Sequence, residues 1–153
     1  MKILSLDTAM AACSAAVIDT QEHRPLAEAF VAMERGHAEA LPPMVAEVMQ
    51  KASVDFAQID RIAVTTGPGT FTGVRIGLAF ARGLGLALGI PVIGIDSLSA
   101  IATNDSSAGP LLVASDARNG EVYAAAYDAA RNLVSAPHVS TASSASTGQA
   151  PGT

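Results

Sequence analysis

The segment best suited to chemistry is the glycine-rich stretch at residues 67–75, with the sequence GPGTFTGVR. It follows an apolar run at 62–66 and precedes a helical pattern, which predicts a strand, a tight turn and a helix. A turn of this kind leaves backbone N–H groups without partners at the helix N-terminus, where the helix dipole favours an anion. The candidate phosphate-type loop comprises Gly67, Pro68, Gly69 and Thr70, joined by Asp7 and Thr8 at the end of the first expected strand.

The spacing of the glycines argues against the commonest nucleotide cradles. Gly67, Gly69 and Gly73 give G-x-G-x-x-x-G rather than the dinucleotide-binding G-x-G-x-x-G, and no lysine lies nearby as in a P-loop. The segment is therefore either a strand-to-helix turn or an anion site of another type. Asp7 is correspondingly either a turn acid or an acid that faces a metal or phosphate.

Other residue types show no catalytic arrangement. His37 is followed four residues later by Leu41, so the pair of histidines that binds a metal on one helix face is missing. Cys13 lies in a small-residue strand and is interpreted as a buried apolar residue rather than a nucleophile. We therefore expect no catalytic residue and no metal.

The helix expected at 72–88 has one face of small side chains only, because Gly73, Gly77, Ala81 and Gly85 recur every fourth residue. Interior glycines weaken a helix by roughly 1 kcal/mol each relative to alanine, so a close backbone neighbour must offset that cost. The rest of the helix is largely apolar, and only Arg75 and Arg82 are charged. Such a helix is buried on nearly every side, either by the neighbouring helix of this chain or by another subunit.

Composition predicts one compact protein without a nucleic-acid surface of its own. The chain has 153 residues, half of them hydrophobic, and a formal net charge of −5 without any cluster of lysine and arginine. Its only cysteine, Cys13, permits no internal disulfide, which favours a reducing compartment. We expect a cytoplasmic protein that contacts no membrane and reaches RNA only through another subunit.

The order of the expected elements is that of an α/β protein with a mixed sheet. An antiparallel meander at 2–6, 11–19 and 26–33 precedes helix 36–51, strand 62–66, helix 72–88 and strand 91–95. We expect a regular helix only from the prolines at 42 and 43. The expected domains are a lobe at 1–104, the start of an incomplete second lobe at 105–134, and a disordered low-complexity tail at 135–153.

Four segments together resemble the TsaB (YeaZ) family, the dimerisation subunit of the bacterial machinery that makes threonylcarbamoyladenosine in tRNA. They are residues 3–9 with 13–16 (ILSLDTA, CSAA), 67–75 (GPGTFTGVR), 93–98 (IGIDSL) and 116–123 (DARNGEVY). The resemblance runs from residue 1 to about 130. It implies an actin/Hsp70/sugar-kinase type N-terminal lobe and a non-catalytic role.

The resemblance also implies the partners. A TsaB-like subunit pairs with the catalytic threonylcarbamoyltransferase subunit, works beside a small ATPase, and pairs with itself when alone; ADP or ATP at a subunit interface is a further possibility. The catalytic relative binds its metal partly through His-x-x-x-His, where this chain has His37 and Leu41, so the loop at 67–70 is interpreted as vestigial. The two central helices form the interface in such pairs. The candidate interface residues are His37, Leu41, Met44, Val45, Val48, Gly73, Val74, Gly77, Leu78, Ala81, Arg82 and Gly85.

Family members usually continue with a second lobe well beyond the length of this chain, so a nucleotide cleft would lack much of one wall. Two alternatives to the scaffold stay open. One is an actin-like ATP-binding phosphotransferase that uses Asp7 and the loop at 67–73, and the weaker one is a protease that acts on the partner.

Overall fold

The structure is a computed structural model that describes residues 1–22 and 24–146. The chain divides into two compact units, one from Met1 to Ile95 and one from Asp96 onward. Each unit has its own sheet and is described by itself.

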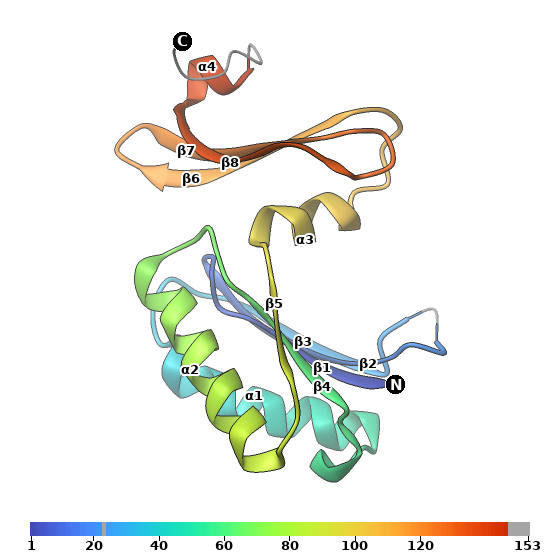
Figure 1. Ribbon diagram of the computed structural model, residues 1–153. Helices are drawn as coiled ribbons and strands as arrows, with labels where there is room; N and C mark the ends of the chain where they lie inside the picture. Colours follow the sequence, from blue (N-terminus) through green and yellow to red (C-terminus); the bar gives the residue numbers. More distant parts are fainter. Residues whose placement is uncertain (23, 147–153) are drawn as a thin grey trace. The chain divides into compact units, whose positions relative to one another are not determined.

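The first unit is a five-stranded mixed sheet with two long helices (Figure 1). The sheet order is β3-β2-β1-β4-β5, with β1 antiparallel to β2 and parallel to β4. This arrangement confirms the predicted mixed α/β lobe. The elements are β1 (Lys2–Asp7), β2 (Ala12–Asp19), β3 (Ala27–Ala32), α1 (His37–Ala52), the 3-10 turn η1 (Phe56–Gln58), β4 (Arg61–Thr65), α2 (Phe71–Leu88) and β5 (Val92–Ile95).

The core of this unit lies on one face of the sheet. Leu4 pairs with Val17 and Leu6 with Ala15 across β1 and β2, so their side chains share a face. Both helices cover that face, and their apolar residues join those of β1, β2 and β4 in one buried cluster. The buried residues of the strands alternate along the sequence, and those of α1 recur at helical spacing. Both sets contribute to this core, which is why the sequence pattern predicted these elements.

The helix α1 begins earlier than expected, at His37 rather than at the prolines. Gly36 enters the helix with φ +88, a left-handed conformation that glycine adopts readily, and its carbonyl accepts a hydrogen bond from Ala40 N at 3.0 Å. Pro42 and Pro43 therefore lie inside the helix, where their missing N–H groups leave the carbonyls of Ala38 and Glu39 without helical donors.

The second unit is a three-stranded antiparallel sheet, β6-β7-β8, with helix α3 packed against β6 and β7. Asp96 caps α3 by accepting a hydrogen bond from Ser99 N at 2.7 Å. Leu98 and Ala102 of that helix are buried with Val113, Ala125 and Tyr127. The elements are α3 (Ser97–Asn104), β6 (Leu111–Arg118), β7 (Glu121–Tyr127), β8 (Leu133–Thr141) and α4 (Ala142–Ser146).

Two domain predictions differ from the structure. The first unit ends at Ile95 rather than 104, because α3 packs on the strands that follow it. The expected disorder from 135 is wrong as far as residue 146, because β8 continues to Thr141 and pairs with β7, Val139 opposite Tyr123. Backbone pairing of this kind does not require large side chains. Residues 147–153 of the expected tail lie outside the described residues.

Candidate functional site

The loop at 67–70 packs directly on the chain that leaves β1. A Cβ atom at Gly69 would overlap the carbonyl of Ala9, and Thr70 N donates a hydrogen bond to that same carbonyl oxygen at 2.8 Å. Gly67 has φ +101, which side-chain-bearing residues rarely adopt. The glycines at 67 and 69 are thus required by backbone conformation and close approach.

The polar side chains at the end of β1 bind groups of this chain. Asp7 Oδ1 accepts hydrogen bonds from Thr65 Oγ1 at 2.6 Å and from Ala9 N at 2.8 Å. Thr8 Oγ1, which is fully buried, donates to the carbonyl of Gly73 at 2.7 Å. These bonds link β1 to the end of β4 and to the first turn of α2.

The N-terminus of α2 is closed by its own cap. Thr70 Oγ1 accepts a hydrogen bond from Gly73 N at 3.1 Å, the usual role of threonine at this position. Two N–H groups of the candidate anion loop, those of Thr70 and Gly73, therefore already have acceptors in the chain. The contacts are those of a structural turn, and anion binding by the loop stays a prediction.

The small-residue face of α2 packs against the strands of its own unit. A Cβ at Gly77 would lie 2.6 Å from Thr8 Oγ1, and one at Gly85 2.5 Å from Val92 Cγ2. Gly73, Gly77, Ala81 and Gly85 are the buried positions of the helix. This face is therefore covered inside its own unit, because Thr8 after β1, Val64 of β4 and Val92 of β5 supply the close neighbours that we expected from another subunit.

The predicted interface residues of α1 are also in the core. Leu41, Met44, Val45 and Val48 are buried and belong to the cluster shared with β1, β2 and β4. His37 is buried as well, with Nε2 at 3.1 Å from the carbonyl oxygen of Met10. Helical periodicity finds the apolar face of a helix but does not say which surface covers it.

The opposite face of α2 is apolar and exposed. Leu86 is 86% exposed and Phe71 is 73% exposed, although both are large hydrophobic residues. The exposed and half-buried positions on this side recur at helical spacing, and we call them the outer stripe: Phe71, Arg75, Leu78, Ala79, Arg82 and Leu86. Of the predicted interface residues, only Leu78 and Arg82 belong to it, and Val74 is half-buried beside it.

The sequence did contain a signal for the outer stripe. Phe71, Arg75, Ala79 and Leu86 lie about half a turn from the small-residue face, which marks the side of the helix away from the sheet. We expected a partner on the small-residue face, which this chain's own strands cover, because small residues allow close approach in both situations. The Arg75 guanidinium lies 4.3 Å from the centre of the Phe71 ring, a cation–π contact on the stripe itself.

By length and composition alone, α2 could cross a membrane, since its 18 residues have a mean hydropathy of 1.3. One side of it packs on β1, β4 and β5. This is the arrangement of a core helix with one side left uncovered.

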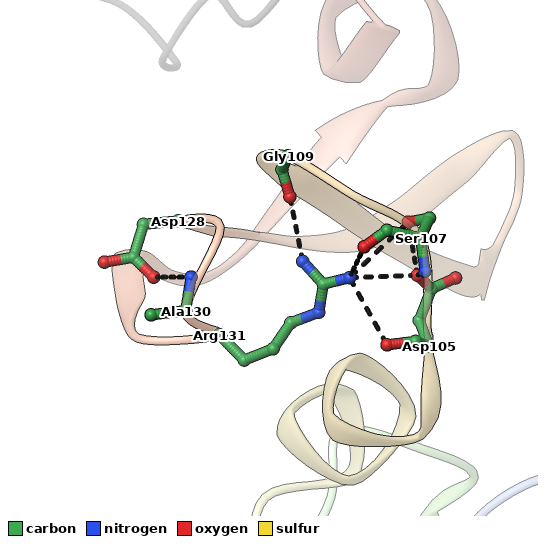
Figure 2. Close-up of polar contacts among 6 residues, drawn as sticks. All are labelled: Asp105, Ser107, Gly109, Asp128, Ala130 and Arg131. Carbon is green, nitrogen blue, oxygen red and sulfur yellow. Dashed lines mark hydrogen bonds and ion pairs between the residues drawn. The ribbon is translucent and has the colours of Figure 1, made fainter.

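In the second unit, Asp105 and Asp128 are charged groups with shifted pKa values, and both lie close to Arg131 in the sequence or in contact with it. Figure 2 shows Arg131, whose Nη1 donates to Gly109 O at 2.9 Å and whose Nη2 donates to Ser107 O at 2.6 Å and lies 3.1 Å from Asp105 Oδ1. Hydrogen bonds from Ser107 lower the pKa of Asp105, and hydrogen bonds from Asn132 lower that of Asp128. These contacts hold the loop before β6 and the turn before β8.

Two further groups bear on chemistry. Burial raises the pKa of the Cys13 thiol, which disfavours the reactive thiolate. Within residues 1–22 and 24–146, the structure contains no group of three His, Cys, Asp or Glu side chains that could hold a metal ion.

Comparison with known proteins gives consistent matches. A family model described as TsaD, tRNA N6-adenosine threonylcarbamoyltransferase, matches residues 31–145. The tRNA threonylcarbamoyladenosine biosynthesis protein TsaB of Escherichia coli is 37% identical over 138 residues, which cover 86% of this chain and 57% of that protein. A solved structure titled YeaZ from Pseudomonas aeruginosa is 35% identical with a TM-score of 0.78, covering 91% of this chain and 66% of that one.

A catalytic relative also matches over a shorter stretch. The tRNA N6-adenosine threonylcarbamoyltransferase of Erythrobacter litoralis is 50% identical over 64 residues, which cover 42% of this chain and 19% of that protein. The chain spans just over half the length of the TsaB protein named above.

Proposed function

Because this chain belongs to the TsaB (YeaZ) family, we propose that it is a non-catalytic subunit that binds the catalytic threonylcarbamoyltransferase subunit in tRNA threonylcarbamoyladenosine synthesis. Its first unit is an actin/Hsp70/sugar-kinase type N-terminal lobe, in agreement with the mixed sheet and the family match. The role is that of a scaffold, which positions the partner and performs no chemical step.

The observation that carries this proposal is the exposed outer stripe of α2. A rigid helix that keeps Phe71 and Leu86 in water gains roughly 1.5–3 kcal/mol for each such side chain that a partner buries. Large apolar residues grouped on one element are typical of a protein–protein interface rather than of an ordinary surface.

The environment of Asp7 and Thr8 supports a scaffold over a phosphotransferase. Both side chains make hydrogen bonds that hold β1, β4 and α2 together. These bonds involve Oδ1 of Asp7 and the hydroxyl of Thr8, and the structural role that they give both residues requires no nucleotide. No observation favours the protease alternative.

The proposed partner is the catalytic subunit, because this chain resembles a catalytic relative in sequence. A catalytic relative that is 50% identical over 64 residues shares part of this architecture, and related subunits commonly pair through equivalent surfaces. We propose in addition that the complex includes a small ATPase subunit and that the chain contacts tRNA only through the complex. In the absence of the catalytic subunit, we propose that the chain pairs with itself. Cytoplasmic location and nucleotide at a subunit interface stay predictions.

The experiment is a titration of the catalytic subunit with wild-type chain and with Leu86→Glu, followed by calorimetry. Leu86 is almost fully exposed, so the variant should fold normally and bind at least ~30-fold more weakly, the loss typical of an apolar side chain that an interface buries. The matched control is Val134→Glu, which places the same charge on an exposed apolar residue of β8 and should bind like wild type. Unchanged affinity in Leu86→Glu would contradict the proposal.

A further inference from the structure

We propose that Asn119, at the tip of the hairpin between β6 and β7, is a modification site at which the side-chain amide deamidates spontaneously to aspartate and isoaspartate. Asparagine followed by glycine is the sequence in which this reaction is fastest, because the attacking nitrogen belongs to the next residue and glycine has no side chain to obstruct it. The site lies in the second unit, and the reaction requires no partner subunit, so it is independent of the proposed function.

Asn119 and Gly120 form the two-residue turn of this hairpin, since Arg118 at the end of β6 pairs with Glu121 at the start of β7. Their φ values are +55 and +79, and positive φ at both central residues is typical of a type I′ turn, in which Asn-Gly is a preferred pair. Both residues are exposed. Among the described residues, a Cβ at Gly120 would have no neighbour within 4 Å apart from its adjoining chain. No packed segment therefore shields the amide of Asn119.

The attacking nitrogen, Gly120 N, is not used by the fold. In the part of the chain that the structure describes, it has no hydrogen-bond acceptor. The strand end beside it is held in part by a side chain, because Arg118 N donates to Asp116 Oδ1 at 2.7 Å and the strand pairing shifts register between these two residues. Arg118 also has φ +69, which is unfavourable for a residue with a side chain. Few contacts therefore resist the local opening that brings Gly120 N to the amide carbon of Asn119.

The reaction needs only the chain and water. Gly120 N gives up its proton and forms a bond to Asn119 Cγ, while the side-chain nitrogen takes up a proton and leaves as ammonia. The product is a five-membered succinimide ring. Water then opens the ring at either of its two carbonyl carbons and yields aspartate or isoaspartate. Both products add a negative charge, and isoaspartate also lengthens the backbone of the two-residue turn by one carbon.

The other two asparagines of the chain lack this combination of features. Asn104 precedes an aspartate whose backbone N–H already donates to the carbonyl of Ala102 at 3.3 Å. Asn132 precedes a leucine, and its own amide nitrogen donates to Asp128 Oδ2 at 2.9 Å. At each of them a side chain obstructs the attack and a hydrogen bond holds one of the reacting groups. Both serve as controls for Asn119 within the same molecule.

The first test stores the full chain at mildly alkaline pH and follows all three asparagines by peptide mass spectrometry, with an unstored sample digested in parallel. Asn119 should convert at least about tenfold faster than Asn104 or Asn132, because only its attacking nitrogen is free of both a neighbouring side chain and a hydrogen bond. The rate should rise with pH, since that nitrogen must lose its proton. Equal rates at the three positions, or no conversion of Asn119, would overturn the inference.

The second test identifies the isoaspartate product. The stored chain is treated with a protein isoaspartate methyltransferase and labelled S-adenosylmethionine, which methylates the carboxylate of isoaspartate. We expect the label in the peptide that contains residue 119. The variant Asn119→Gln should lose it, because the longer side chain would have to close a six-membered ring. Labelling of stored Asn119→Gln at the wild-type level would place the reaction elsewhere in the chain and contradict the assignment.

Discussion

At the scale of single residues, the glycines of α2 differ in what surrounds them. A Cβ at Gly73 would meet the carbonyl of Thr8 and the side chain of Thr70, whereas among the described residues a Cβ at Gly83 would have no neighbour within 4 Å apart from the adjoining backbone of its own helix. The sequence places both in one helix and gives them the same intrinsic cost. Only the packing separates a glycine that is required from one that is merely tolerated.

The first prediction compares these two positions. Gly83→Ala should raise the free energy of unfolding by about 0.5–1 kcal/mol, because the new methyl meets open space and alanine favours the helix. Gly73→Ala should lower it by roughly 1–3 kcal/mol, because the methyl forces β1 and α2 apart. Urea denaturation of both variants checks the pair, and a stabilised Gly73→Ala would refute the packing described.

The second prediction concerns pH. Hydrogen bonds from Asn132 lower the pKa of Asp128 in the folded chain, whereas the unfolded value is about 3.9. The resulting stabilisation is fully present above the unfolded value and is lost as pH falls through the lower, folded pKa. Denaturation midpoints between pH 3 and 6 should therefore fall toward the acid end, and less steeply in Asp128→Asn. An identical slope in the variant would show that Asp128 is not responsible.

At the scale of elements, the sequence predicts which helices and strands exist better than it predicts what each face of a helix contacts. The mixed order of strands and helices follows from alternation, helical spacing and turn residues, and the structure confirms it. We expected a partner on the small-residue face of α2, which is buried in its own unit, because Gly77 and Ala81 would allow either a segment of this chain or another subunit to approach. The sequence of the helix alone does not show which distant segment of the chain covers this face.

The third prediction concerns the loop before β6. Arg131 bonds the carbonyls of Ser107 and Gly109 through separate nitrogens of one planar group, which lysine cannot reproduce (Figure 2). Arg131→Lys should therefore speed hydrogen exchange at residues 105–110 and destabilise the second unit by roughly 1–2 kcal/mol. Exchange in α1 serves as the internal control. Unchanged exchange at 105–110 would mean that Arg131 does not hold this loop.

At the scale of the whole molecule, the two units have separate cores. In the part of the chain that the structure describes, the buried cluster of β1, β2, β4, α1 and α2 contains no residue beyond 95. The sequence predicted a second unit but placed its start too late and its end too early, because the packing of α3 on β6 and β7 and the pairing of β8 with β7 are tertiary contacts that local sequence does not reveal. We predict that residues 1–95 alone unfold cooperatively, as circular dichroism during heating would record; a gradual, non-cooperative loss of signal would contradict it.

The central claim is that the outer stripe of α2 is the surface that binds the catalytic subunit. The chain suits a direct measurement, because its only native cysteine, Cys13, is fully buried and a new surface thiol can be labelled alone. An environment-sensitive dye on Ala79→Cys, in the middle of the stripe, should shift to the emission of an apolar site when the catalytic subunit is added. The same dye on Ala57→Cys, exposed in η1, should not change. Equal emission from both labelled variants in a complex proven to form would contradict the account.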